Sequence, residues 1–337
     1  MKEFANAYFS QVTGAFVHYY KPIRIYIYNH QKYPYVALNP LVKSLLFNDA
    51  RYNEGKHLFT LSVDKDKSDF FVFPCDLNYF EAREEEIDQH LEFFRGNEER
   101  HIFFDHRDQP TPYPLDTSIR FKVSLQKKQV SDSLICIPYM EVVDNLFWYL
   151  HETRHIKYHL SFIGQRTDFR EAIVGALDEF VPNSYFCFRD TFFHGNYLSY
   201  CPEGKPTRPV ISPAVNLAQR KEFIDISLKS KFILALRGYG LNSFRFFEAL
   251  SMGLPPVLVS DDCALPYENI IDYDQFCFQI EGSDIPTATK QIQELLSAVN
   301  EKKYKEMCQM ARFYYDSYLS AKNSLYLLYN HLQKIGF

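Results

Sequence analysis

Short apolar runs alternate with a helix-spaced segment through the first half of the chain. Residues 23–28 alternate β-branched or aromatic side chains with others, and residues 70–74, 101–105 and 133–138 are nearly all apolar. These patterns predict strands. Residues 79–94 are highly charged but carry apolar side chains at helical spacing, which predicts a helix. Buried strands separated by helices favour a parallel sheet that is covered on both faces.

The second half of the chain shows the same alternation. Strands are predicted at residues 159–164, 185–188, 231–236 and 257–259. Helices are predicted at residues 169–180 and at about 243–252, and residues 285–337 are predicted to form two or three more helices. We expect two α/β units that meet near residues 145–160 and leave a cleft between them.

Length and composition agree with a soluble chain of two domains. The 337 residues exceed the usual ~100–200 residues of one domain. The net charge of −5 supplies no positive field for a polyanion, so nucleic acid is not an expected partner. Seven scattered cysteines without a C-x-x-C pair favour reduced thiols over a disulfide framework or a structural zinc site.

Glycine is scarce, and this excludes two nucleotide-binding classes. The chain has 12 glycines, and neither G-x-G-x-x-G nor G-x-x-x-x-G-K-[ST] occurs. Both motifs need glycine where the backbone approaches a phosphate closely. Dinucleotide-dependent dehydrogenases and P-loop NTPases are therefore not expected.

The segment 237–257 is the richest in candidate chemistry. Its order is the end of a strand, a glycine-containing loop, an Asn-Ser cap, a helix and the next strand. Ligands of open parallel sheets bind beyond the carboxyl ends of the strands, and a helix start attracts anions. Arg237 and Arg245 suit phosphate oxygens. Glu248, one turn after Arg245, can accept hydrogen bonds from ribose hydroxyls. The segment indicates a cradle for a nucleoside diphosphate.

The spacing of these residues also permits a purely structural interpretation. Ser243 would then only cap the helix, Arg245 and Glu248 would form a solvent-facing pair, and Gly253 would end the helix. Both interpretations stay open on spacing alone.

A longer ordered pattern favours the cradle. After Arg237-Gly238 the chain reads Ser243-Phe244-Arg245-Phe246-Phe247-Glu248-Ala249-Leu250, then Gly253-Leu254-Pro255-Pro256-Val257, then Leu265-Pro266-Tyr267. Residues 231–276 thereby resemble the nucleotide-sugar half of exostosin-family (GT47-like) glycosyltransferases, in which R-G or S-G precedes S-x-R-x-x-E-A-(I/L)-x-x-G-x-(I/V)-P-V. Weaker similarity runs upstream, from the strand at 23–28 to residues 160–164 and Arg170.

The resemblance implies an α/β fold of GT-B type, with two Rossmann-like domains facing a cleft. Residues 1–150 would form the acceptor-side domain and residues 151–315 the nucleotide-sugar-binding domain. The C-terminal helices would pack back, with residues 316–337 returning to the N-terminal domain. The resemblance also implies that Arg237, Ser243 and Arg245 face the diphosphate and that Glu248 faces the ribose.

Three more residues enter the implied donor site. Gly164, Arg166 and Arg170 would lie at the first loop of the C-terminal domain, near the donor. The family transfers a sugar with inversion, usually from a UDP sugar, and the GT-B class generally works without a metal. We therefore expect a nucleotide sugar and a glycan acceptor as partners and no cofactor.

Inversion needs a base that deprotonates the acceptor hydroxyl. Asp105 ends the strand at 101–105, His106 and Asp108 come directly after it, and Asp76 comes directly after the strand at 70–74. All of them would lie at carboxyl strand ends of the N-terminal domain. Their alternative role is to turn the chain and cap the next element, and the sequence does not choose among them.

Metal-binding patterns are present but weak. Asp64-Lys65-Asp66 and Asp272-Tyr273-Asp274 match a D-x-D triplet that is too short to be specific. His151, Glu152 and His155 match H-E-x-x-H, the zinc-hydrolase pattern. A charged Arg154 lies inside it and a strand is predicted at once after it. A zinc metallohydrolase and a non-catalytic carbohydrate-binding protein remain the alternatives to an inverting glycosyltransferase.

The start of the chain bears on location. Residues 4–20 contain several polar side chains and no basic leader, so neither a signal peptide nor an anchor is expected there. A cytoplasmic enzyme of bacterial or viral origin is the expectation, or a Golgi lumenal one if the chain is a piece of a longer protein.

Overall fold

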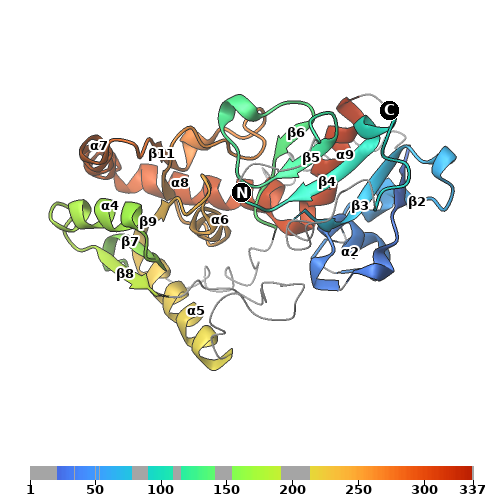
Figure 1. Cartoon of the computed structure of the whole chain (residues 1–337). Coiled ribbons are helices and arrows are strands. Elements are labelled where there is room, and N and C mark those ends of the chain that lie inside the picture. Colours follow the sequence, from blue (N-terminus) through green and yellow to red (C-terminus); the bar gives the residue numbers. More distant parts are fainter. Residues whose placement is uncertain are drawn as a thin grey trace.

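The computed structural model describes residues 21–335 except for 34, 50, 53, 78–89, 109–114, 141–153 and 191–212. The described residues form two α/β units that lie side by side, each built on one parallel sheet (Figure 1). The expected GT-B type fold, with two Rossmann-like halves, is therefore confirmed. The limits at residues 150 and 315 stay predictions.

The N-terminal sheet has six parallel strands in the order β2-β1-β3-β4-β5-β6. The strands are β1 (Ile23–Ile27), β2 (Phe59–Leu61), β3 (Phe70–Asp76), β4 (His101–Asp105), β5 (Ile119–Lys122) and β6 (Leu134–Cys136). The C-terminal sheet has five parallel strands in the order β11-β10-β9-β7-β8. They are β7 (Tyr158–Gln165), β8 (Tyr185–Arg189), β9 (Ser230–Leu236), β10 (Pro256–Val259) and β11 (Phe278–Ile280).

The α-helices connect and cover these strands. They are α2 (Pro40–Phe47), α4 (Asp168–Asp178), α5 (Pro213–Leu228), α6 (Phe244–Ser251), α7 (Ile285–Ala298), α8 (Glu301–Tyr314) and α9 (Ser324–Lys334). Polar caps begin several of them: the side chains of Asn39, Thr167 and Asn300 each accept a backbone N–H from the first turn. Two or three helices were expected after residue 285, and three are present: α7, α8 and α9.

All eight strands predicted from the sequence are confirmed, as are the helices at α4 and α6. Three strands and two helices were not predicted: β2, β5, β11, α2 and α5. The predicted helix at 79–94 lies mostly outside the described residues, and its described end, residues 90–94, is not helical.

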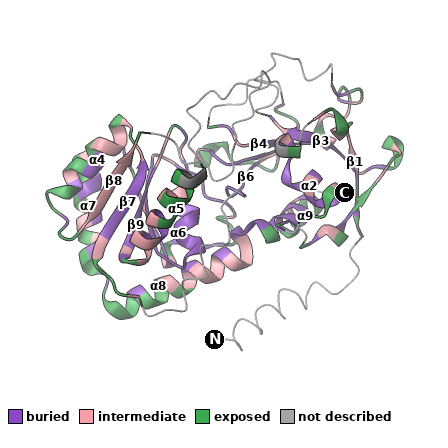
Figure 2. Cartoon of the chain, turned by 90° about the horizontal axis from the view of Figure 1, so that it is seen from below, coloured by how far each residue is buried: buried purple, intermediate pink, exposed green. Residues whose placement is uncertain are grey.

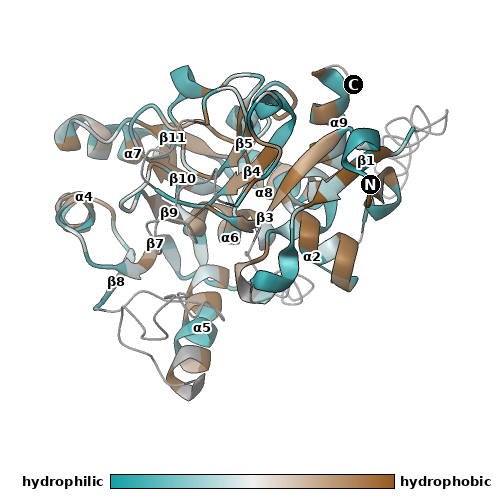
Figure 3. Cartoon of the chain, turned by 45° about the vertical axis from the view of Figure 1, so that its right-hand side comes forward, coloured by the Kyte–Doolittle hydropathy of each residue, from teal (hydrophilic) through white to brown (hydrophobic). Residues whose placement is uncertain are grey.

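Helix α6 ties the two units into one apolar interior. The inner faces of the strands are buried in both units, whereas the outer faces of the helices are exposed (Figure 2). Apolar residues follow the same division, as Figure 3 shows. On α6, Phe246, Phe247 and Leu250 belong to the same buried cluster as the strands β1, β3 and β4. Ala249 and Met252 pack instead with Phe223 of α5.

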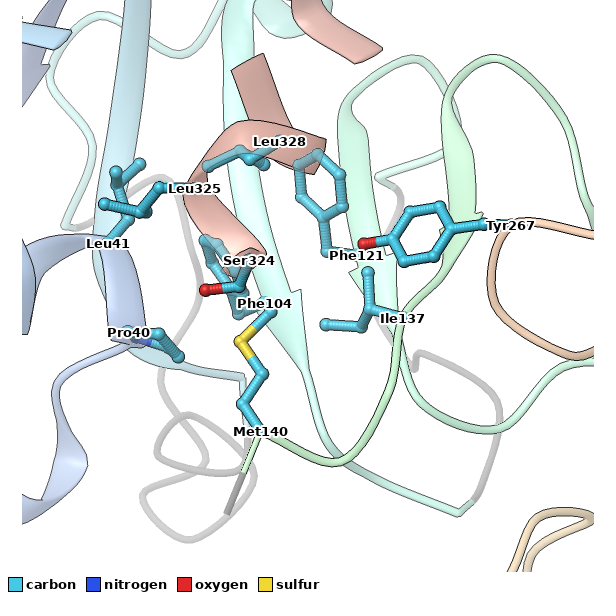
Figure 4. Close-up of a pocket in the computed structure, with 10 residues that line it drawn as sticks. All are labelled: Pro40, Leu41, Phe104, Phe121, Ile137, Met140, Tyr267, Ser324, Leu325 and Leu328. Carbon is cyan, nitrogen blue, oxygen red and sulfur yellow. The ribbon is translucent and has the colours of Figure 1, made fainter. Parts of the chain in front are cut away.

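Helix α9 lies against the N-terminal sheet, although its sequence follows the C-terminal one (Figure 1). His331 meets the ring of Phe121 on β5, and the hydroxyl of Tyr329 donates to the carbonyl of Lys21 at 3.1 Å. Leu325 and Leu328 border a void of about 10 Å³ between α9 and the sheet (Figure 4). A void of this size holds at most one water, so it is a packing gap and not a ligand site.

Shortening a side chain at this interface should destabilise the fold. Leu328→Ala enlarges an existing void, and we expect a loss of about 2–4 kcal/mol in the free energy of unfolding, measured by urea denaturation. Leu217→Ala on α5 is the control, since Leu217 is 69% exposed and its truncation should change little. Equal stability of both variants would contradict the packing described for α9.

Candidate functional site

The C-terminal sheet has its topological switch point between β7 and β9. The connection through α4 leads from β7 to β8 on one side, whereas β9 lies on the other side. Helix α4 packs with α7 and α8 on one face, and α5 and α6 pack together on the opposite face. The crevice beyond the carboxyl ends of two such strands is where ligands bind in open α/β sheets. The predicted residues Arg170, Arg237 and Arg245 all lie there.

Arg170 bonds to the backbone at the carboxyl ends of two strands. Its guanidinium donates to the carbonyl of Gln165 at 2.9 Å, Leu236 at 3.2 Å and Arg237 at 3.1 Å, and so joins the ends of β7 and β9. Burial lowers the pKa of Arg170 to about 10, and the nearby charge of Arg245 acts in the same direction. At neutral pH the group stays charged, so a concentrated positive charge sits at the switch point.

Arg245 and Glu248 form the predicted pair on α6, but the pair is not solvent-facing. Their side chains are 13% and 11% exposed. The guanidinium of Arg245 contacts the carboxylate of Glu248 through Nη1, and its Nε donates to the carbonyl of Ile163 at 2.7 Å. The structural alternative of an exposed pair is therefore wrong. Arg245 is instead fixed at the end of β7, inside the crevice.

Ser243 occupies the N-cap position of α6 without capping it through its side chain. Its backbone N–H donates to the side-chain carbonyl of Asn242 at 2.8 Å, and its own side chain is almost buried. The hydroxyl is thus not committed to the helix. The first turn of α6 presents backbone N–H groups toward the same crevice.

Arg237 and Arg166 stand at the two sides of the crevice. Nε of Arg237 lies 3.5 Å from the carboxylate of Asp261, and the two side chains are 30% and 33% exposed. Arg166 pairs with Glu171 and is 52% exposed. Gly164 lies within β7, where an added Cβ would come 2.6 Å from the ring of Phe162. Its role here is therefore to let β7 pack.

Asp108 of the N-terminal unit reaches the loop that precedes α6. The backbone N–H of Gly240 and the hydroxyl of Tyr139 hydrogen-bond to its carboxylate. A Cβ on Gly240 would come 2.6 Å from Cγ of Asp108 and 2.8 Å from Oγ of Ser124, so a larger residue would displace these side chains. Residue 108 keeps exposed surface, but its carboxylate is packed between the units. That burial raises the pKa of Asp108 above its ordinary value, against the opposing effects of neighbouring cations and hydrogen bonds.

Asp105 has a different environment from Asp108. It is fully buried, and its two carboxylate oxygens accept from Nε of Arg107 at 2.8 Å and from Nζ of Lys122 at 3.1 Å. Burial lowers the pKa of Lys122, and the charge of Asp105 opposes this. A carboxylate shared by two cations and closed to solvent is poorly suited to take a proton from a substrate, and Asp105 has a structural role.

His106 and Asp76 form a second pair at the same sheet edge. Nδ1 of His106 contacts the carboxylate of Asp76, which also accepts the backbone N–H of His106 at 3.0 Å. Nε2 of His106 is buried. The contact with Asp76 orients the imidazole.

The loop before α6 is anchored by residues that the sequence did not single out. The backbone N–H of Leu241 donates to Oγ of Ser124 at 2.9 Å, and Nδ2 of Asn242 donates to the carbonyl of Val123 at 3.3 Å. The ring of Tyr139 stacks on Phe244 with centroids 4.0 Å apart. No local pattern in the sequence marks these contacts, because they join residues more than a hundred positions apart.

In the part of the chain that the structure describes, aspartates of both D-x-D triplets form local hydrogen bonds. Asp64 caps a short 3-10 helix by accepting the N–H of Asp66 at 3.0 Å, and Asp272 accepts from Gln275 at 2.9 Å. His151 and Glu152 lie outside the described residues, and His155 is exposed on a non-helical segment. Among the described residues, no group of three metal-ligating side chains converges, and no helix is long and apolar enough to cross a membrane.

Loss of the Asp105 carboxylate should destabilise the N-terminal unit. Asp105→Ala leaves two buried cations without their counter-ion, which costs about 3–5 kcal/mol in the free energy of unfolding. Denaturant unfolding measures this loss. Asp116→Ala is the matched control, because Asp116 is 92% exposed and its pairing with Arg120 at 3.4 Å should contribute little. A loss under 1 kcal/mol for Asp105→Ala would contradict the structural role.

Proteins of known name are similar in sequence to part of this chain. An Exostosin-1 homolog of Caenorhabditis elegans is 34% identical over 118 residues, which cover 35% of this chain and 29% of the relative. A probable glycosyltransferase of Arabidopsis thaliana is 26% identical over 89 residues, covering 26% of this chain and 18% of the relative. The chain thus spans less than a third of the length of these relatives.

One similar solved structure is a sucrose-phosphate synthase from Thermosynechococcus elongatus. It is 10% identical to this chain with a TM-score of 0.46, and the alignment covers 94% of this chain and 99% of that chain. A glycosyltransferase from Rickettsia africae has 12% identity, a TM-score of 0.44, and coverage of 94% and 100%. The family model described as the Exostosin GT47 domain matches residues 21–295, which is most of the chain. The protein therefore belongs to the Exostosin GT47 domain family.

Proposed function

We propose that the protein is an inverting glycosyltransferase that moves a sugar from a nucleotide donor, a UDP sugar, to a carbohydrate acceptor. One observation carries the proposal: Arg170, Arg237 and Arg245 converge at the switch point between β7 and β9, and Asp108 meets the adjacent loop from the opposite unit. A crevice that would suit a diphosphate thereby lies next to a carboxylate. The choice of uracil rests on the resemblance to the exostosin family.

The crevice suits the leaving group of such a donor. Arg245 and Arg237 would contact the phosphates, with the Ser243 hydroxyl and the first turn of α6. Glu248, already oriented by Arg245, would accept from a ribose hydroxyl. As the glycosidic bond breaks, negative charge grows on the diphosphate, and fixed cations and N–H dipoles stabilise it. We propose that these groups do the work of a divalent cation, so that turnover persists in a chelator.

Asp108 is the base that this geometry favours. Its carboxylate would take the proton from an acceptor hydroxyl while that oxygen attacks the anomeric carbon. The new bond forms on the face opposite the leaving diphosphate, which departs with the electron pair of the broken bond. The hydrogen bonds from Gly240 and Tyr139 would orient the carboxylate. The raised pKa of Asp108 lies closer to the pKa of an efficient general base at neutral pH.

We also propose that the protein acts in the cytoplasm.

The zinc-hydrolase alternative finds no support in the described residues, since His155 lies on an exposed, non-helical segment. A carbohydrate-binding protein without catalysis differs from the proposal in one measurable respect. It would bind glycan but would neither bind UDP nor release it from a UDP sugar.

Removing the Arg245 guanidinium should weaken nucleotide binding. We expect Arg245→Gln to bind UDP about 10- to 100-fold more weakly in titration calorimetry, because a charge-assisted hydrogen bond to phosphate is lost. Arg24→Gln is the control, since Arg24 pairs with Asp69 at 2.7 Å on the amino end of β1. If wild-type protein is not stabilised against heat by UDP or any UDP sugar, the donor assignment fails.

Asp108→Asn should abolish turnover but not donor binding. Asparagine still accepts the N–H of Gly240 but cannot take a proton, so we expect kcat to fall by about 10²–10⁴-fold with an unchanged dissociation constant for UDP. Because the pKa of Asp108 is raised by burial, activity should fall on the acid side at a higher pH than an ordinary aspartate would give.

Stability gives an independent check of the same residue. A carboxyl with a raised folded-state pKa contributes stability that is present at low pH and is lost as pH rises through that pKa. The asparagine variant stays neutral and should therefore gain stability relative to wild type as pH rises through the same range. An Asp108→Asn variant with normal kcat would rule the residue out as the base.

A further inference from the structure

Arg237 and Arg245 share a feature that the sequence did not reveal. Cζ of Arg237 lies 4.2 Å from the ring centroid of Phe169, and Cζ of Arg245 lies 4.2 Å from that of Phe223. Within the described part of the chain, the other arginine–ring approaches are longer, from 4.7 to 5.9 Å. The two tightest of these pairs thus flank one crevice.

We propose that Phe169 and Phe223 are positioning residues that hold the guanidinium groups of Arg237 and Arg245 in the plane required by a bound diphosphate. The inference rests on the proposed function, because the diphosphate is the leaving group of the proposed donor. It adds two aromatic rings, from helices on opposite faces of the sheet, to the machinery of that site.

Both rings are themselves fixed by packing. Phe223 is 5% exposed and packs on α6 and the sheet with Ile163 and Met252. Phe169, in the first turn of α4, lies against Gly282, where an added Cβ would come 2.8 Å from its Cζ. A ring held in this way presents a constant face to the cation above it.

Each guanidinium therefore lies over a ring and near a carboxylate. Asp261 approaches Arg237, and Glu248 pairs with Arg245. A ring attracts the cation through its negative face and does not compete for the N–H groups, which point outward in the guanidinium plane. The remaining in-plane N–H groups can then meet two phosphate oxygens side by side.

Such fixing favours binding through entropy. A free arginine side chain loses rotamer entropy when a ligand immobilises it. A side chain already held in the bound orientation loses less, so the ligand binds more tightly. The rings thereby act on affinity for the diphosphate without touching it.

Leucine substitution separates this role from simple packing. Phe223→Leu and Phe169→Leu keep most of the apolar contact but remove the ring face. We expect both variants to bind UDP and inorganic pyrophosphate about 2- to 30-fold more weakly, the range that a cation–π contact supports. Tyrosine at the same positions should keep wild-type affinity. Phe71→Leu is the matched control, because Phe71 is equally buried and lies 4.7 Å from Arg100 in the N-terminal unit.

Replacing Phe223 with pentafluorophenylalanine tests the positioning role in a variant that should still fold. It keeps the shape of the ring but reverses the charge distribution of its face, so affinity for pyrophosphate should fall while the thermal unfolding midpoint is kept. Unchanged affinity in both leucine variants, or in the fluorinated one, overturns the positioning role and leaves the proposed function standing.

Comparing UDP with pyrophosphate as ligands separates the positioning role of the two rings from the proposed function. Weaker pyrophosphate binding in the leucine variants, with no UDP binding even in wild type, would keep the positioning role and remove uracil from the donor. Absence of both UDP and pyrophosphate binding in wild-type protein would overturn the two proposals together.

Discussion

The contact between the loop that precedes α6 and the carboxyl ends of β4 and β5 is the constraint on which the candidate site depends. Ser124 and Val123 hold the backbone of Leu241 and the side chain of Asn242. Gly240 admits the carboxylate of Asp108 where any side chain would collide with it. One short loop thus sets the position of the α6 N-terminus relative to both sheets. Any shift of this loop would move the arginine crevice away from the carboxylate opposite it.

Charge balance explains how so many cations can share one crevice. Asp261 lies close to Arg237, and Glu248 pairs with Arg245. The negative charge of Asp108 stabilises the charged form of Arg170. Each cation is thereby partly compensated before any ligand arrives, which limits mutual repulsion in a partly buried place. The same compensation limits the net positive charge that a diphosphate would meet. Affinity in such a site depends on the direction of the N–H groups more than on charge alone.

The sequence predicted the strands that show a continuous apolar run or a regular alternation, and it missed a strand that breaks both patterns. Strand β5 carries Arg120 and Lys122 inside the protein, where Asp105 accepts from the lysine across the sheet. No local pattern distinguishes such residues from surface charges, because their partner lies on another strand. The three-residue strands β2 and β11 are too short to show any periodicity.

The candidate site, too, was predicted from the sequence only in part. The ordered motif around Ser243, Arg245 and Glu248 marked the crevice, because its chemistry is carried by neighbours on one loop and one helix. The sequence could not choose between Asp105 and Asp108, because both lie at the carboxyl end of one strand and differ only in the distant residues that contact them. The one is enclosed by two cations, whereas the other meets Gly240 from the second unit.

The seam between the units also bears on how substrates would be enclosed. The backbone N–H of Lys127 donates to the carbonyl of Asp262 at 3.0 Å, and that of Ala264 donates to Leu125 at 2.9 Å. Together with the apolar cluster that α6 shares with the N-terminal sheet, these bonds would all have to break for the units to swing apart. Asp108 already meets the loop before α6 across this seam, so the carboxylate needs no domain closure to reach the crevice.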